Sequence, residues 1–179
     1  MCGIAGSARI WGASGELRLV ESMVESLRHR GPDQVSMFRS ECFVGGLARL
    51  SILDIQGGAQ PFVSENGRYV AFFNGEIYNA PALRRWLTNR GHVFSSDCAD
   101  GEILPHLFEE HAIGFASHLE GMFAVAIWDR ELRTLYLARD PHGIKPLYFT
   151  LDGGVASFAS ELKALLIPGS VELEPHKLD

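Results

Sequence analysis

The last third of the chain constrains the fold most, because it consists of short apolar segments separated by tight turns. "MFAVAIWD" and "LRTLYLARD" flank a polar turn at Arg130-Glu131, and "PLYFTL" and "VASFAS" flank a turn at 152–154. Segments of this length, rich in β-branched and aromatic residues, are typical of strands paired in hairpins. Because these segments are almost continuously apolar, they predict a meander of antiparallel strands in a sheet covered on both faces.

The rest of the chain adds strands and helices to this picture. "FVGGLARLSIL" and "GRYVAFFNG" predict two more strands, the second of which places Asn74-Gly75 just past its end. Apolar residues at helical spacing predict helices at 17–29, before Gly31-Pro32, and around 83–91 and 103–111. Helices flanking two stacked sheets would cover the doubly buried strands, so we expect an α+β fold with antiparallel sheets. The strand order cannot be derived from the pattern.

Size and charge narrow the class of protein. With 179 residues, of which 46% are hydrophobic, the chain is expected to form one domain over 1–179. The formal charge is −6 and Lys and Arg form no block, which argues against a nucleic-acid partner. The first twenty residues lack the apolar core of a signal peptide, and no stretch approaches 18 apolar residues. The expected location is therefore cytoplasmic, without a membrane partner.

Familiar metal and nucleotide motifs are absent from the sequence. The three cysteines have no CxxC spacing, His106 and His111 are not an i, i+4 pair, and nothing resembles HExxH. Neither GxGxxG nor GxxxxGK[ST] occurs. The sequence thus predicts no metal site and no nucleotide cofactor in this chain.

The start of the chain, "MCGIAG", offers a candidate nucleophile at Cys2. A cysteine near a terminus is usually unremarkable, but here removal of Met1 would leave a thiol and an α-amino group on one residue. The reference pKa of an α-amino group, ~7.7–8.0, lies close to that of a thiol, ~8.5, so the amine can accept the thiol proton near neutral pH. The small apolar residues that follow suit a terminus buried in a site.

A second candidate feature is the Asn-Gly pair in "FFNGEIYN". An amide side chain and an unhindered backbone N–H at Asn74-Gly75 can point at the same developing oxyanion. A hairpin turn is the ordinary interpretation of Asn-Gly, and taken alone the pair favours that interpretation.

Taken together, several motifs resemble a known family. "MCGIAG", "RHRGPD", "ARLSILD" followed by "GAQPF", "FNGEIYN", "DGEIL", "LEGMFAVAIWD", and "RDPHGIKPLYF" followed by "ASELKALL" occur in the order found in class II glutamine amidotransferase domains. The series is most similar to the N-terminal glutaminase domain of glutamine-hydrolysing asparagine synthetase. The resemblance implies an N-terminal nucleophile hydrolase fold, which is a four-layer αββα sandwich of two antiparallel sheets.

The resemblance also implies residue roles. Cys2 would attack the carboxamide of glutamine with its own α-amine as base, and Asn74 and Gly75 would form the oxyanion hole. Arg49 would bind the substrate α-carboxylate, and backbone groups of Leu50, Ser51, Ile52 and Leu53 would line the pocket. Asp100, together with Glu76, would bind the α-ammonium group. Arg30 and Asp33 of "RHRGPD" would hold the loops near the nucleophile.

Some assignments stay open at this stage. "SSDCADGEIL" offers Asp97 beside Asp100 as the ammonium partner, although the motif favours Asp100. Arg49 could instead be a strand-edge arginine in a surface ion pair.

The implied reaction passes through a γ-glutamyl thioester and releases glutamate and ammonia. The ammonia would pass to a synthetase domain or subunit, absent here, that makes asparagine from aspartate and would carry ATP and Mg; this domain itself is expected to need no cofactor. No serine precedes a Gly-Gly pair, so the SGGxDS loop of such synthetases is missing. Either the chain is the N-terminal part of a longer protein, which we favour, or it is a stand-alone glutaminase subunit. Homodimerisation is left open.

Two alternatives accompany this interpretation. The same glutaminase chemistry could serve another nitrogen acceptor. The domain could also bind glutamine without turning it over, which retention of Met1 would cause because the α-amine of Cys2 would then be an amide.

Overall fold

The computed structural model describes residues 1–9, 17–51 and 58–167. Its strands form two antiparallel sheets. The first has the order β2-β3-β1-β9-β8, with bounds Gln34–Arg39, Phe43–Arg49, Gly3–Arg9, Val155–Ala159 and Tyr148–Asp152. The second has the order β4-β5-β6-β7, with bounds Phe62–Val63, Tyr69–Ile77, Gly121–Asp129 and Thr134–Arg139.

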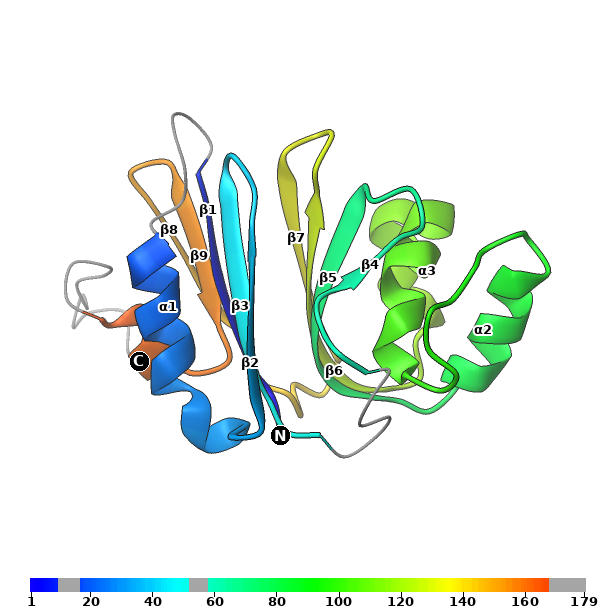
Figure 1. Cartoon of the computed structure of the whole chain (residues 1–179), viewed down its shortest axis with the longest axis horizontal. Helices are drawn as coiled ribbons and strands as arrows, with labels where there is room; N and C mark the ends of the chain where they lie inside the picture. Colours follow the sequence, from blue (N-terminus) through cyan, green and yellow to red (C-terminus); the bar gives the residue numbers. More distant parts are fainter. Residues whose placement is uncertain (10–16, 52–57, 168–179) are drawn as a thin grey trace.

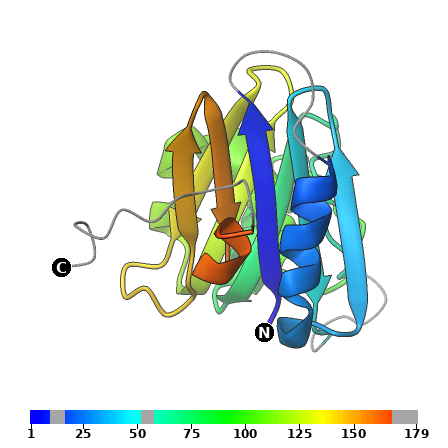
Figure 2. The same cartoon turned by 90° about the vertical axis from the view of Figure 1, so that its left-hand side faces the viewer.

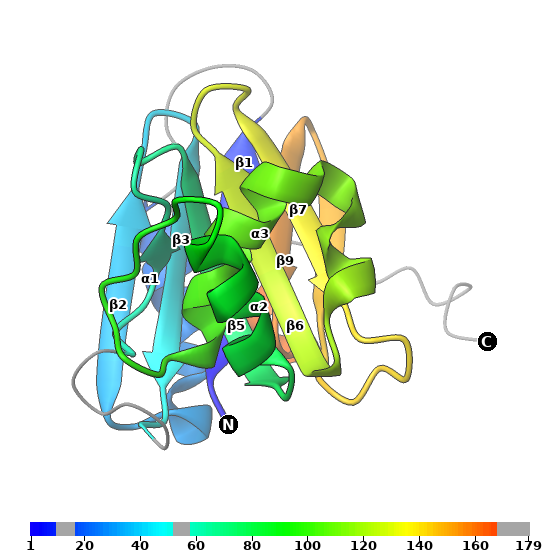
Figure 3. The same cartoon turned by 90° about the vertical axis from the view of Figure 1, so that its right-hand side faces the viewer.

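Helices cover the outer face of each sheet. α1 (Leu17–Ser26) and α4 (Leu162–Leu165) lie on the first sheet, as Figure 2 shows. α2 (Ala80–Thr88) and α3 (Ile103–His111) lie on the second (Figure 3). The short helices are η1 (Arg28–Arg30), η2 (Asp100–Glu102) and η3 (Ala112–His118). Figure 1 shows the resulting helix, sheet, sheet, helix layers, which confirm the predicted αββα sandwich.

Three apolar cores hold the four layers together. Strand β5 shows how, because Val70 and Phe72 enter the core between the sheets while Ala71 and Phe73 enter the core beneath α2 and α3. Between the sheets Trp128 stacks on Phe43 with ring centroids 4.8 Å apart. Strands that alternate between two cores are buried on both faces, which explains their continuous apolar sequences.

Two details of the strand prediction were wrong. The last four strands are not one meander, since β6 and β7 belong to one sheet and β8 and β9 to the other. The β8 strand is also an exposed edge strand, and its Phe149 is 71% exposed, so its apolar residues do not indicate cover on both faces. An isolated apolar run cannot distinguish a central strand from an edge strand, because burial depends on the neighbours that tertiary structure provides.

The predicted helices are present, and α3 has the predicted bounds, whereas α2 begins and ends three residues earlier than the predicted 83–91. The helix predicted over 17–29 ends at Ser26 and continues, after Leu27, as the separate turn η1. The α2 helix is followed by Gly91, whose φ is +101° and whose N–H bonds to the carbonyl of Thr88. The longest of the described helices, α1, has 10 residues, and within the described ranges no helix could span a bilayer.

Candidate active site

A cavity of about 360 Å³ opens beside the first residues of the chain. It lies where the start of β1, the end of β3, the middle of β5 and the turn η2 come together. Seven of the residues predicted for the site line it: Cys2, Arg49, Leu50, Asn74, Gly75, Glu76 and Asp100. Ser51 is not among the described residues that line it, and Ile52 and Leu53 lie outside the described residues.

Cys2 sits directly before β1 and is half-buried at the cavity wall. Its thiol lies 3.8 Å from the carbonyl oxygen of Leu50, within reach of a weak S–H donor. Arg30 donates from Nε to the carbonyl oxygen of Cys2 at 3.1 Å and pairs with Glu161 at 2.9 Å. The backbone of Cys2 is thereby held by an arginine that is itself fixed in an ion pair, and the residue lines the cavity.

Asn74 and Gly75 lie within β5, which corrects the prediction that they follow a strand end. Asn74 pairs with Ala124 and Gly75 with Phe123 in the ladder to β6. The pairing excludes the hairpin-turn interpretation, because the strand runs on to Ile77. The apolar residues stop before Asn74, but backbone pairing with β6 continues. The hydrophobic pattern therefore underestimated the length of the strand.

The side chain of Asn74 is buried and its Nδ2 has no hydrogen-bond partner. Buried amide donors are nearly always satisfied, so an unpaired donor on a cavity wall indicates a ligand that supplies the acceptor. The next residue, Gly75, has no room for a side chain, since a Cβ there would collide with the carbonyl oxygen of Met122. Gly75 itself lines the cavity, and because it has no side chain it does so through its backbone.

Arg49 ends β3 and is only 4% exposed. One of its guanidinium nitrogens, Nη1, lies 3.4 Å from Oε1 of Gln34 in the neighbouring strand. A buried arginine on a cavity wall does not fit the alternative of a strand-edge residue in a surface ion pair. It brings a permanent positive charge to one part of the site.

Asp100 and Asp97 differ clearly in position. Asp97 is exposed, whereas Asp100 is half-buried and lines the cavity. Oδ2 of Asp100 accepts the N–H of Ile77 at 2.8 Å and Oδ1 accepts the N–H of Gly101 at 2.9 Å. Burial raises the pKa of Asp100, although these backbone hydrogen bonds oppose the shift, and the charge of nearby Glu76 adds to it. The geometry thus favours Asp100 over Asp97.

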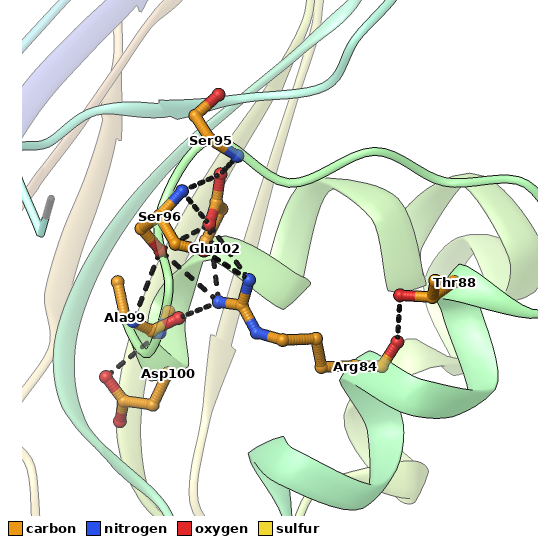
Figure 4. A network of polar contacts seen from close by, with 8 residues as sticks. Arg84, Thr88, Ser95, Ser96, Ala99, Asp100 and Glu102 are labelled. Atoms are coloured by element: carbon orange, nitrogen blue, oxygen red, sulfur yellow. Dashed lines mark hydrogen bonds and ion pairs between the residues drawn. The ribbon is translucent and has the colours of Figure 1, made fainter.

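A buried polar network fixes the loop that carries Asp100 (Figure 4). Arg84 of α2 donates to the carbonyl oxygen of Ala99 at 2.7 Å and pairs with Glu102 at 3.3 Å. The carboxylate of Glu102 in turn accepts bonds from the hydroxyl and the N–H of Ser96. Figure 4 shows the carboxylate of Asp100 directed away from this network.

Residues of the "RHRGPD" motif support the segments that carry Cys2 and Arg49. Oδ2 of Asp33 accepts the N–H of Ser51 at 2.7 Å, and the N–H of Asp33 bonds to the carbonyl oxygen of Arg49 at 3.1 Å. Together with the contact of Arg30 to Cys2, these bonds match the supporting positions expected for Arg30 and Asp33. Ser51 therefore contacts the supporting loop, although it does not line the cavity itself.

Several residues that line the cavity have no role predicted from the sequence, and among the described ones Lys145 is the one with a charged side chain. Lys145 is 6% exposed, and its Nζ lies 3.4 Å from the sulfur of Met1. The carboxylate of Asp140 holds its loop by accepting the N–H groups of Ile144 and Lys145. The signal was present in "RDPHGIKPLYF", but no spacing rule connects a lysine in that motif with position 2.

A family model described as "Glutamine amidotransferase domain" matches residues 1–178. Two curated relatives from Bacillus subtilis are "Asparagine synthetase [glutamine-hydrolyzing] 2", 40% identical over 92% of this chain, and "Asparagine synthetase [glutamine-hydrolyzing] 1", 38% identical over 99% of it. An Arabidopsis thaliana relative, "Asparagine synthetase [glutamine-hydrolyzing] 3", is 42% identical over 83% of the chain. The matched region spans 22%, 29% and 25% of these relatives, respectively.

Solved structures give the same picture of the fold. Glutamine phosphoribosylpyrophosphate amidotransferase from B. subtilis superposes with a TM-score of 0.72 over 96% of this chain and 44% of its own, at 24% identity. A structure described as the allosteric regulatory enzyme of purine biosynthesis has a TM-score of 0.74 at 23% identity, covering 97% of this chain and 44% of its own. At this identity the likeness concerns the fold.

Proposed function

Because the chain belongs to the family of glutamine amidotransferase domains, we propose that its cavity binds glutamine and that Cys2 hydrolyses the carboxamide to glutamate and ammonia. One observation supports this above all. A thiol, an unpaired buried amide donor, a buried guanidinium and a half-buried carboxylate line the same cavity, through Cys2, Asn74, Arg49 and Asp100. The thioester route through a cysteine is typical of the family.

The charges in the cavity suit a free amino acid. In the proposed complex the planar guanidinium of Arg49 binds the α-carboxylate by paired hydrogen bonds. Asp100 accepts from the α-ammonium group, and Glu76, which is exposed at the cavity wall, adds negative charge on that side. A peptide-bound glutamine has neither end group, so it would make neither of these charge-assisted contacts and would bind more weakly.

The proposed chemistry begins at the thiol. The proton of Cys2 moves to the α-amine of the same residue as the sulfur attacks the carboxamide carbon. The carbon–nitrogen bond then breaks while the amine returns the proton, which releases ammonia and leaves a γ-glutamyl thioester. Water adds to the thioester, and its cleavage yields glutamate and the free thiol. Nδ2 of Asn74 and the N–H of Gly75 would stabilise the oxyanion in both halves of the reaction.

This route requires that Met1 be removed, because an acylated nitrogen cannot act as the base. Met1 lines the cavity and contacts Lys145, so the unprocessed chain would also have less room for substrate. Retention of Met1 would leave a domain that binds glutamine without hydrolysing it.

The wider role is also a proposal. By analogy with the relatives, the ammonia would pass to a synthetase domain or subunit that binds ATP and Mg and forms asparagine from aspartate. A cytoplasmic location, and a homodimer as an alternative to a monomer, belong to the same proposal. The alternative is that the released ammonia is passed to a nitrogen acceptor other than aspartate.

The experiment that tests the proposal compares Cys2→Ala with wild-type protein in glutamate release from glutamine. We expect Cys2→Ala to abolish release, whereas Cys98→Ala, at an exposed cysteine, should retain it. A glutamine analogue with an electrophilic carbon in place of the carboxamide should add its mass to the peptide of Cys2. Equal rates in wild-type and Cys2→Ala would refute the nucleophile, and N-terminal sequencing that begins at Met, with no glutamate release, would support the binding-only alternative.

A further inference from the structure

Three potential metal ligands, none of which lines the cavity, meet on the helix-covered side of the second sheet. Glu65 comes from the turn between β4 and β5, His92 from the segment after α2, and His106 from α3. One ligand atom of each lies within 4.8 Å of those of the others. We propose that Glu65, His92 and His106 bind a zinc ion that ties these three segments together.

The carboxylate of Glu65 lies between the two imidazole rings. Its Oε1 is 2.9 Å from Nδ1 of His92, and its Oε2 is 2.6 Å from Nδ1 of His106. The rings face each other edge-on, with centroids 5.2 Å apart. Two imidazole nitrogens and a carboxylate oxygen are a ligand set that zinc accepts, with a fourth position left for water.

His106 supplies an independent sign of a missing ligand. The residue is 1% exposed, and its Nδ1 has no partner in hydrogen-bonding geometry, although Glu65 is near. The nitrogen therefore contacts the carboxylate but is poorly aligned with it for a hydrogen bond. A cation that both groups ligate would give each of them an aligned partner.

His92 has the outer contact that metal-binding histidines usually make. Nδ1 faces Glu65, and Nε2 on the other side of the ring lies 3.3 Å from Oε1 of Glu110. Arg90 in turn pairs with Glu110 at 3.3 Å. A carboxylate that accepts the second ring N–H fixes the tautomer and orientation of the ring and makes the ligating nitrogen more basic.

Binding requires small shifts in both directions: the most distant pair of ligand atoms moves closer, and the Glu65 oxygens, now 2.9 and 2.6 Å from the two histidine nitrogens, move slightly apart. Zinc holds nitrogen and oxygen ligands at ~2.0–2.2 Å in a tetrahedron, which places neighbouring ligand atoms roughly 3.4 Å apart. The present separations, within 4.8 Å, need a shift on the order of 1 Å at the most distant pair. Glu65 lies in an exposed turn, which can supply this movement. The expected absence of a metal site rested on spacing along the chain, whereas these ligands come from separate segments, with Glu65 and His92 27 positions apart.

The experiment titrates zinc into the full chain after treatment with a chelator. We expect one strong site per chain by calorimetry, a tetrahedral absorption spectrum with cobalt as a substitute, and a melting temperature that rises with the logarithm of free zinc. Glu65→Gln and His92→Gln should each weaken the affinity at least 10-fold, as should Glu110→Gln through the outer contact, by about 10- to 100-fold. The matched control is His111→Gln, on the same helix but outside the cluster, which should keep wild-type affinity.

Three outcomes would overturn the proposal. They are absence of a strong site in wild-type protein, unchanged affinity in both Glu65→Gln and His92→Gln, and loss of affinity in His111→Gln. Unchanged affinity in the first two variants would assign the ion elsewhere, for example to the thiol of Cys2. Melting curves of each variant without metal identify those that fail to fold. Glutamate release should stay unchanged in Glu65→Gln, which separates this test from that of the proposed function.

Discussion

Arg30 donates a hydrogen bond from its Nε to the carbonyl oxygen of Cys2, at 3.1 Å. The same guanidinium pairs through Nη1 with Oε1 of Glu161 at 2.9 Å, and the arginine side chain is only 9% exposed. Two contacts in one plane fix the guanidinium, and through it the backbone of the proposed nucleophile. Arg30 is thus a positioning residue, since its guanidinium contacts the backbone of Cys2 and the side chain of Glu161 and does not line the cavity.

Arg30→Lys should lower the rate of glutamine hydrolysis without removing the charge. A lysine ammonium is a point donor and cannot hold Cys2 and Glu161 in the same fixed geometry. Because a small displacement of a nucleophile raises the activation barrier, we expect kcat to fall about 10- to 100-fold with a smaller change in KM. Steady-state kinetics measure this, with Arg28→Lys, at an exposed arginine, as the control. A rise in KM at constant kcat would contradict the positioning role.

Glu161 should make stability depend on pH. Burial raises its pKa, but hydrogen bonds from Arg30, His29 and Lys163 outweigh this effect and bring the pKa from 4.5 to about 2. Because the pKa is lower in the folded state, the ion pairs stabilise the protein above 4.5, and this contribution is lost as the pH falls from 4.5 to about 2. Urea unfolding of wild-type protein and Glu161→Gln should therefore show a difference in unfolding free energy that shrinks across this window. A difference in unfolding free energy that stays constant with pH would contradict the stabilising role of the Glu161 ion pairs.

Asn74→Ala should separate activity from stability. Nδ2 of Asn74 has no partner in the described structure, so its removal breaks no internal hydrogen bond of that donor. As an oxyanion donor, however, it should contribute ~2.7–4 kcal/mol to lowering the barrier, and its loss should reduce kcat about 10²- to 10³-fold. Kinetics and melting curves are measured together. The control is Asn66→Ala, which removes contacts of a surface turn and should affect stability but not kcat. An unchanged kcat in Asn74→Ala would exclude the oxyanion role.

Much of the fold could be predicted because apolar periodicity reflects the layers directly. Strands β5 and β6 are buried on both faces, so their sequences are continuously apolar and their presence was clear. The assignment of strands to sheets could not be derived, since it depends on which partner each strand finds at long range. For the same reason the apolar pattern predicted that Asn74 follows the end of a strand, whereas pairing with β6 continues β5 to Ile77.

The site was predicted from motifs more than from physical pattern. Cys2, Arg49, Asn74 and Asp100 are far apart in the sequence, and only folding brings them to one cavity. Chemistry could identify Cys2 as a candidate, because a thiol next to a potential α-amine is reactive wherever it lies. It could not identify Lys145, whose approach to the start of the chain depends on a loop held by Asp140 and on no local signal.

Asp100→Asn should weaken glutamine binding, and Asp97→Asn should not. Asp100 lines the cavity, whereas Asp97 is exposed and serves as the matched control. Burial raises the pKa of Asp100 above 3.8, so its negative charge is lost at a higher pH than for an ordinary aspartate as the solution is acidified. KM for glutamine should therefore rise as the pH falls through this raised pKa, and this acid limb should be absent in Asp100→Asn. Equal KM values in the two variants would exclude the ammonium role for Asp100.

Gly75→Ala should damage both the fold and the site. A Cβ at this position would collide with the carbonyl oxygen of Met122 and lie 2.8 Å from Cα of Phe123, both on the paired strand β6. These are backbone atoms, so β5 and β6 must separate locally, and such overpacking typically costs ~1–3 kcal/mol. We expect a lower unfolding free energy in urea and a loss of glutamate release larger than any fraction unfolded explains, because the N–H of Gly75 moves away from the proposed oxyanion position.

The control for this substitution is Gly114→Ala, at a glycine of η3 with open space around the position of the added Cβ. Gly114→Ala should leave the unfolding free energy and the rate of glutamine hydrolysis close to wild type. If Gly75→Ala were as stable and as active as Gly114→Ala, β5 and β6 would have to accommodate a methyl group where the structure leaves no space. That result would contradict both the strand register and the proposed oxyanion hole.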